Sequence, residues 1–192
     1  MVKIKPDALF FFLLLDVRQN KTMTKLTSNI AEYNPRWSEM YEFEKTRLTD
    51  ILANDIKEIH HIGSTSVVGL AAKPEIDILI VISAKNTNKD FTSKLVQLGY
   101  RRGNDLSKGH QFYKKDVNDV RTHKIHICID GHSKVKELIG FRNYLRANKK
   151  EREEYQALKY KLEVENQHGI SEYLSKKGPF IQHVIQSALQ VK

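Results

Sequence analysis

The sequence predicts an α+β fold: a mixed β-sheet with helices packed mainly on one side and a C-terminal helical segment. Residues 76–82 are an isoleucine-rich apolar run typical of a buried strand, and residues 123–130 alternate isoleucine with other residues as a strand does. One helical pattern precedes the strands and a series of helical patterns follows them. This order differs from the regular alternation of a doubly wound fold and favours helices segregated beside one sheet.

The first half of the chain is predicted to contain a helix and two strands. Asn34-Pro35 marks the helix start, because asparagine caps helices and proline suits the first helical position. A short strand is expected at 59–62, a loop or helical turn at 64–70, and a buried strand at 76–82. The apolar stripe of the helix consists of Trp37, Met40, Tyr41, Leu48, Ile51 and Leu52.

The second half is predicted to complete the sheet and then turn helical. Residues 91–98 form a helix that stops at Gly99. Strands follow at 100–103, 111–115 and 123–130, with a turn at 116–119. The expected helices are 134–148, 150–167 and 179–191.

Composition limits the possible partners. The 192 residues carry a formal net charge of +9, which favours anionic ligands. The basic residues form short pairs rather than a stripe with interleaved aromatics, so no dedicated nucleic-acid groove is expected. Cys128 is the single cysteine and predicts a reducing, cytoplasmic location. The sequence lacks a Walker loop, a Gly-x-Ser-x-Gly elbow and a Gly-x-Gly-x-x-Gly motif, which argues against kinase, hydrolase and dinucleotide-binding classes.

The chain divides into an apolar N-terminal extension, residues 1–22, and one domain, residues 23–192. The apolar run 8–15 is too short to span a bilayer, which needs roughly 20 residues. It resembles part of a signal peptide, but no small-residue cleavage site follows it. An over-long start before Met23 is the preferred interpretation, and export is the alternative.

The candidate site is centred on the segment from His61 to Asp77. Gly63-Ser64 forms a tight turn after the first strand, and such a turn suits phosphate oxygens. Asp77 lies inside an apolar strand and therefore needs a partner. Two interpretations stay open: Asp77 belongs to a ligand site, or it braces the turn by a hydrogen bond.

Other residues extend this candidate set. Glu75 shares the strand face of Asp77 and offers a second carboxylate, so both are candidate metal ligands. Asp130 and His126 converge on Asp77 if their strands are neighbours, and structural hydrogen bonding is their alternative role. Lys73 is either a phosphate contact or a solvated lysine. The candidate substrate-binding residues are Gly63, Ser64, Ser66, Lys73, His61 and His126, and the candidate catalytic residues are Asp77 and Asp130.

This segment resembles the core of the nucleotidyltransferase superfamily. The resemblance implies that Gly63 and Ser64 hold phosphate and that a carboxylate pair, beginning with Asp77, binds Mg²⁺. The second position of that pair is Leu79, which is unable to ligate a metal. The carboxylate set expected for metal chemistry is therefore incomplete.

Further blocks identify a narrower family. They are Tyr33-Asn34-Pro35-Arg36-Trp37, the segment 61–77, His123-Lys124-Ile125-His126, Phe141-Arg142-Asn143-Tyr144-Leu145-Arg146 and the segment 173–181. Together they are similar to the GrpB (UPF0157) family. The resemblance implies a nucleotidyltransferase-like fold whose partner is a nucleotide or other phosphorylated small molecule. Two functions stay open: nucleotidyl transfer with Mg²⁺, and a non-catalytic binding or folding-accessory module like the domain fused to dephospho-CoA kinase.

Overall fold

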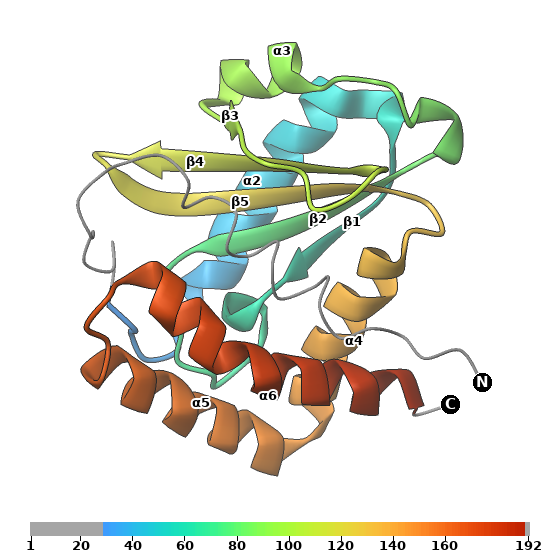
Figure 1. Ribbon diagram of the computed structural model, residues 1–192. Coiled ribbons are helices and arrows are strands. Elements are labelled where there is room, and N and C mark those ends of the chain that lie inside the picture. Colours follow the sequence, from blue (N-terminus) through green and yellow to red (C-terminus); the bar gives the residue numbers. More distant parts are fainter. Residues whose placement is uncertain (1–28, 191–192) are drawn as a thin grey trace.

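A computed structural model describes residues 29–190, which form a five-stranded mixed sheet flanked by helices (Figure 1). The strand order is β1-β2-β5-β4-β3. Strands β2 and β5 are parallel neighbours, and the other adjacent pairs are antiparallel. The strands are β1 (Ile56–Ile62), β2 (Ile76–Ile82), β3 (Arg101–Arg102), β4 (His110–Val117) and β5 (Val120–Ile129).

The principal helices are distributed on both faces of the sheet and at one end of the molecule. They are α2 (Arg36–Leu52), α3 (Thr92–Leu95), α4 (Ser133–Ala147), α5 (Lys149–Val164) and α6 (Ile170–Gln190). Among residues 29–190, no helix is both long and apolar enough to cross a membrane. The predicted α+β class, the mixed sheet and the C-terminal helical segment are confirmed.

The larger core lies between one sheet face and α2 with α3. Alternation along each strand sends every second isoleucine to this face, where it meets the apolar stripe of α2. The main participants are Ile76, Ile78, Ile80, Ile125 and Ile127 from the sheet, Trp37, Tyr41 and Leu48 from α2, and Phe91 and Leu95 beside them.

The opposite face is covered in part by α4. Leu79, Val81 and Cys128 pack there against Val135, Leu138 and Ile139. The helices are therefore not confined to one side, although the larger cluster is on the α2 side. Because side chains alternate, Asp77 and Lys124 lie on the same face as Leu79.

Helices α5 and α6 lie together at the end of the molecule away from α3 (Figure 1). They join the loop after β1 through an apolar cluster that includes Val67, Leu70, Tyr155 and Val184. This loop is also held by hydrogen bonds: Ala71 N–H donates to Gln156 (2.7 Å), and the ammonium of Lys159 donates to the Ala71 carbonyl. The C-terminal helices are thus tied directly to the segment between β1 and β2.

Several boundaries differ from the sequence expectation. Strand β1 begins at Ile56, three residues before the predicted start at 59. The hairpin turn narrows to Asn118 and Asp119, which both have positive φ. Helix α6 begins at Ile170, well before the predicted start at 179, and contains Pro179 in its interior. The predicted extension, residues 1–22, lies outside the described residues.

Candidate functional site

Gly63 allows the chain to pass directly against Asp77. Its backbone has φ +70° and ψ −174°, a conformation that only glycine adopts readily. A Cβ atom at this position would lie 2.4 Å from Oδ2 of Asp77, far inside van der Waals contact. The glycine is therefore required both by the backbone conformation and by the position of the carboxylate.

The turn after Gly63 is closed by its own hydrogen bonds. The Ser66 hydroxyl donates to the Gly63 carbonyl (2.6 Å), and the Ser66 and Val67 N–H groups also point back into the turn. Burial raises the pKa of the Tyr155 phenol on α5, and the Ser64 hydroxyl, which lies near this phenol, lowers the pKa against that larger effect. Ser66 thus has a structural role, whereas Ser64 links the turn to the C-terminal helices.

Asp77 and Glu75 share a cation supplied by the neighbouring strand. Lys124 is the register partner of Asp77, and its ammonium forms an ion pair with Glu75 Oε2. The same ammonium lies 3.9 Å from Oδ1 of Asp77. The Asp77 side chain is 24% exposed and that of Glu75 is 9% exposed, so the pair is set into the surface rather than fully solvated.

Two further lysines bring positive charge to these carboxylates. Lys177 on α6 interacts electrostatically with Asp77, Glu75, Lys124 and Lys73. The ammonium of Lys73 is buried and, within residues 29–190, has no hydrogen-bond partner. It lies 5.0 Å from the ring centroid of Tyr173, and the ammonium of Lys177 lies 5.1 Å from the same ring. We call Lys73, Glu75, Asp77, Lys124 and Lys177 the lysine–carboxylate cluster.

The pKa values of the carboxylates reflect a competition between burial and charge. Burial raises the pKa of Asp77, and the ammonium of Lys124 offsets only part of this effect. For Glu75 burial acts in the same direction, but the contact with Lys124 outweighs it and the pKa lies below its usual value. The pKa of Lys124 is raised, since the two carboxylates outweigh its own burial.

The other amines of this region are harder to protonate. Burial and the nearby Lys124 lower the pKa of Lys177 to about 8. Burial also lowers the pKa of Lys73, while Glu75 acts against the shift. On α5, burial and the charge of Lys177 lower the pKa of Lys159 to about 7. This response is expected where buried positive charges exceed the negative charges beside them.

His61 is a structural residue at the end of β1. Its ring stacks on Tyr41 with the centroids 4.7 Å apart. The Thr65 hydroxyl donates to the Glu75 carbonyl, so it accepts from His61 Nε2 at 3.1 Å. Burial, helped by Arg146 and Arg142, lowers the pKa of His61 to about 4 and keeps the ring neutral. His61 therefore positions the segment that carries Glu75.

His126 lies on the face of Asp77 and is paired with another histidine. The Leu106 N–H donates to His110 Nδ1 (3.1 Å), which leaves the proton of a neutral His110 on Nε2. That proton is donated to His126 Nδ1 (2.9 Å). Burial lowers the pKa of both rings, so this bond joins two neutral imidazoles.

Asp130 does not join Asp77. It follows β5 and lies near Ile82, at the far end of β2 from Asp77. The run of about six strand residues corresponds to a separation of roughly 20 Å. Asp130 instead forms an exposed ion pair with Lys57. The expected convergence of these two aspartates therefore does not occur. Leu79, which occupies the second carboxylate position of the superfamily pattern, is packed in the core beneath α4.

The carboxylates do not fit a Mg²⁺ ion. Magnesium requires several oxygen ligands in near-octahedral geometry. Glu75 and Asp77 offer oxygens, but the ammonium of Lys124 already lies against both. Within residues 29–190, no group of three or more His, Cys, Asp and Glu side chains is arranged to hold a metal ion.

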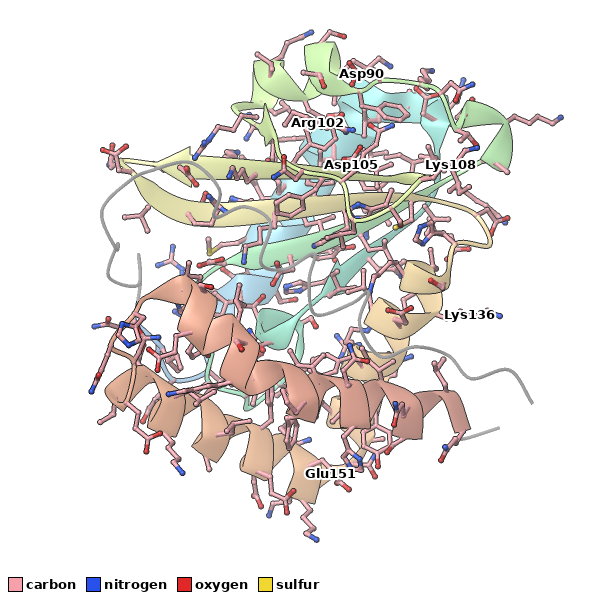
Figure 2. All side chains as sticks on the ribbon, viewed as in Figure 1. Asp90, Arg102, Asp105, Lys108, Lys136 and Glu151 are labelled. Atoms are coloured by element: carbon pink, nitrogen blue, oxygen red, sulfur yellow. The ribbon has the colours of Figure 1, made fainter. Side chains whose placement is uncertain are left out.

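A separate cavity of about 240 Å³ lies near β3, away from α5 and α6 (Figure 2). Figure 2 labels Asp90, Arg102, Asp105 and Lys108 from its lining. The charged groups here are largely engaged with neighbours: Arg102 pairs with Asp105, and Asp90 accepts hydrogen bonds from Thr92. This cavity offers a weaker case for ligand binding than the lysine–carboxylate cluster.

Sequence reasoning missed the contribution of the C-terminal helices. In the sequence Lys177 belongs to one of the short basic pairs, Lys176-Lys177, and Lys124 belongs to the strand predicted at 123–130. The available signal was the placement of Lys124 on the polar side of its strand, opposite the Ile125 face. No local pattern indicated that Lys177 would reach Asp77, because that contact depends on how α6 packs.

Comparison with known proteins places the chain in a family. Residues 27–187 match the family model described as GrpB protein. The chain is 32% identical over 162 residues to a UPF0157 protein of Halalkalibacterium halodurans, covering 83% of this chain and 81% of the relative. It is 34% identical to the UPF0157 protein YqkA of Bacillus subtilis, covering 85% of this chain but 48% of YqkA.

A solved structure agrees with the sequence matches. The crystal structure of conserved protein GrpB from Enterococcus faecalis aligns with a TM-score of 0.78 and 32% identity, covering 84% of this chain and 98% of that one. An RNA terminal U-transferase aligns with a TM-score of 0.48 and 12% identity, a similarity too distant to bear on function. The family model, the relatives and the shared fold agree, and the chain belongs to the GrpB family.

Proposed function

We propose that the lysine–carboxylate cluster binds a phosphorylated small molecule, with a nucleotide as the leading class. The observation that carries the proposal is the ammonium of Lys73, which is buried without a hydrogen-bond partner in the described chain. A buried, unsatisfied polar group costs about 1–3 kcal/mol, and more when it is charged. Phosphate oxygens would remove that penalty by accepting from Lys73.

The charge balance of the cluster supports the same ligand. Lys73, Lys124 and Lys177 face Glu75 and Asp77, and Arg121 adds further positive potential. An anion entering this region would meet an excess of donors and would raise the lowered pKa values of Lys73 and Lys177. Lysine ammonium groups are common phosphate ligands because they act as compact point charges with several donors.

The turn at Gly63-Ser64 completes the proposed site. The Tyr155 phenol is influenced by both Ser64 and the charge of Asp77, which brings the turn, α5 and the cluster together. The role proposed here is binding. Nucleotidyl transfer through Mg²⁺ on Asp77 and Glu75 is not part of it, because the arrangement with Lys124 does not fit that ion. The proposed location is the cytoplasm, where the single Cys128 stays reduced.

Isothermal titration calorimetry on the full chain tests the proposal. ATP, GTP, CTP and inorganic tripolyphosphate are titrated with and without Mg²⁺. Binding is expected for at least one nucleotide, with at least a tenfold loss of affinity in Lys73→Met and Lys177→Met. The matched control is Lys136→Met, since Lys136 is exposed and points away from α4 in Figure 2.

The outcomes separate the ligand classes. Binding of a nucleotide but not of tripolyphosphate would indicate that the base or sugar is also recognised. Equal binding of both would indicate a polyphosphate site. No binding of any of these anions, or an equal effect of the Lys73 and Lys136 substitutions, would refute the proposal.

A further inference from the structure

The ammonium of Lys124 occupies the position that a metal ion would take if Asp77 and Glu75 were its ligands. Lys124 is the direct register partner of Asp77 on the neighbouring parallel strand. From there its side chain reaches both carboxylates, forming an ion pair with Glu75 and lying 3.9 Å from Asp77. The sheet register fixes Lys124 beside Asp77, and Glu75 immediately precedes strand β2.

The geometry gives this ammonium two functions at once. It neutralises carboxylates that would otherwise repel an incoming anion, and it keeps access to a ligand because its side chain is 30% exposed. A divalent ion bridging carboxylates and phosphate would perform the same two tasks. An ammonium has three N–H donors and no vacant coordination site, so it attracts phosphate without polarising it as a metal does.

We infer that Lys124 is a tethered replacement for a divalent cation, so that phosphate binds this site independently of metal. The inference rests on the proposed function for its ligand and on the ion-pair geometry for its cation. It assigns Lys124 as the residue that determines which cation the site uses. Removing the ammonium should therefore create a metal site that the native protein lacks.

Manganese binding to the full chain tests this directly, because Mn²⁺ requires no nucleotide and is detected by electron paramagnetic resonance. The native protein and Lys124→Arg are expected to show only weak background binding. Lys124→Gln removes the charge, and Lys124→Asp adds a third carboxylate opposite Asp77. Both are expected to bind Mn²⁺ at least tenfold more tightly, and Asp77→Asn in the same chain should abolish the gain.

Phosphate binding with and without metal is the second test of the role of Lys124. Tripolyphosphate affinity of the native protein should change less than twofold when Mg²⁺ is added. Lys124→Gln should bind at least tenfold more weakly without metal and recover part of the loss with it. Circular dichroism and the urea midpoint of each variant establish that it is folded, and Lys124→Gln carries the Mn²⁺ test alone should Lys124→Asp fail to fold.

The two proposals fail in different ways. Native protein that binds Mn²⁺ through Asp77 would overturn the role of Lys124, even if nucleotides bind. Folded Lys124→Gln that gains no Mn²⁺ affinity would also overturn it. Native protein that binds no phosphate, together with the expected Mn²⁺ results, would refute the proposed function and leave the tethered cation supported.

Discussion

Replacing Gly63 with alanine is a sharp test of the contact between the turn and Asp77. The backbone conformation alone makes a side chain unfavourable by about 1–3 kcal/mol. The new Cβ would lie 2.4 Å from Asp77 Oδ2, so the carboxylate must move, and such overpacking costs a further ~1–3 kcal/mol. The free energy of unfolding should therefore fall by about 2–6 kcal/mol, a large share of the ~5–15 kcal/mol typical of a domain.

Gly69 provides the matched control. It also has positive φ (+77°), but an added Cβ there meets no atom within 4 Å. Gly69→Ala should thus show backbone strain alone, about 1–2 kcal/mol. In the double variant Gly63→Ala, Asp77→Ala the 2.4 Å contact is removed and only the Asp77 Cβ remains, 3.0 Å from the new Cβ. Stability relative to Asp77→Ala should therefore fall by the backbone strain and a smaller steric cost than in Gly63→Ala alone.

Urea denaturation followed by tryptophan fluorescence measures these differences. Trp37 is the single tryptophan and is 2% exposed in the core. With a slope of about 2 kcal/mol per molar urea, Gly63→Ala should lower the midpoint by about 1–3 M. A Gly63→Ala midpoint equal to that of Gly69→Ala would refute the close approach of Asp77 to the turn.

Three further predictions concern titratable groups. Lys159 has a pKa of about 7 when folded against 10.5 for a free lysine, so the unfolded chain binds more protons between these values. Unfolding free energy should therefore rise from pH 7 towards pH 10, and Lys159→Met should flatten the rise in urea titrations; an unchanged slope would contradict the assignment. Phosphate affinity should fall above pH 8 as Lys177 loses its proton, whereas calorimetry of Lys177→Met should show a weaker fall. Burial raises the pKa of Cys128 to about 12, so a thiol reagent at pH 8 should modify it only after denaturant is added, and rapid modification of the native protein would be inconsistent with its packing.

The sequence predicted the elements whose signals are local. Strand 76–82 has the predicted bounds, because its apolar run ends at polar residues on both sides. Gly99 ends the short helical segment with φ +83°, as its position predicted. Asn34 accepts a hydrogen bond from the Arg36 N–H at the start of α2, as a capping asparagine should.

Helix α6 shows where local signals were insufficient. Gly178-Pro179 is a strong helix-breaking pair, and it led to a predicted start at 179. The helix nevertheless runs through both residues, with Tyr173 buried before them and Val184 after them. Burial on both sides of the proline outweighs the hydrogen bond that proline removes, and a local sequence pattern does not contain that information.

The candidate site was predicted only in part, because some of its contacts are local in sequence and others depend on the packing of distant elements. The approach of Gly63 to Asp77 follows from a glycine turn preceding a strand carboxylate, and both residues belong to one continuous segment. Lys177 is 100 positions from Asp77 and reaches it only through the packing of α6. Asp130 is an even number of residues from Lys124, as expected for the same face of the sheet. However, the parallel register of β2 and β5 places Asp130 beside the end of β2 that is farther from Asp77.

Metal-independent phosphate binding at the lysine–carboxylate cluster can be seen directly in a crystal structure of the protein grown with tripolyphosphate and Mn²⁺, with the anomalous signal of manganese recorded. Phosphate oxygens should lie within hydrogen-bond distance of the ammonium groups of Lys73 and Lys124, with no manganese between Glu75 and Asp77. Manganese bound to those carboxylates with Lys124 displaced would contradict the assignment of Lys124 as the cation of the site. Phosphate bound only elsewhere, for example in the cavity near β3, would contradict the proposed function as well.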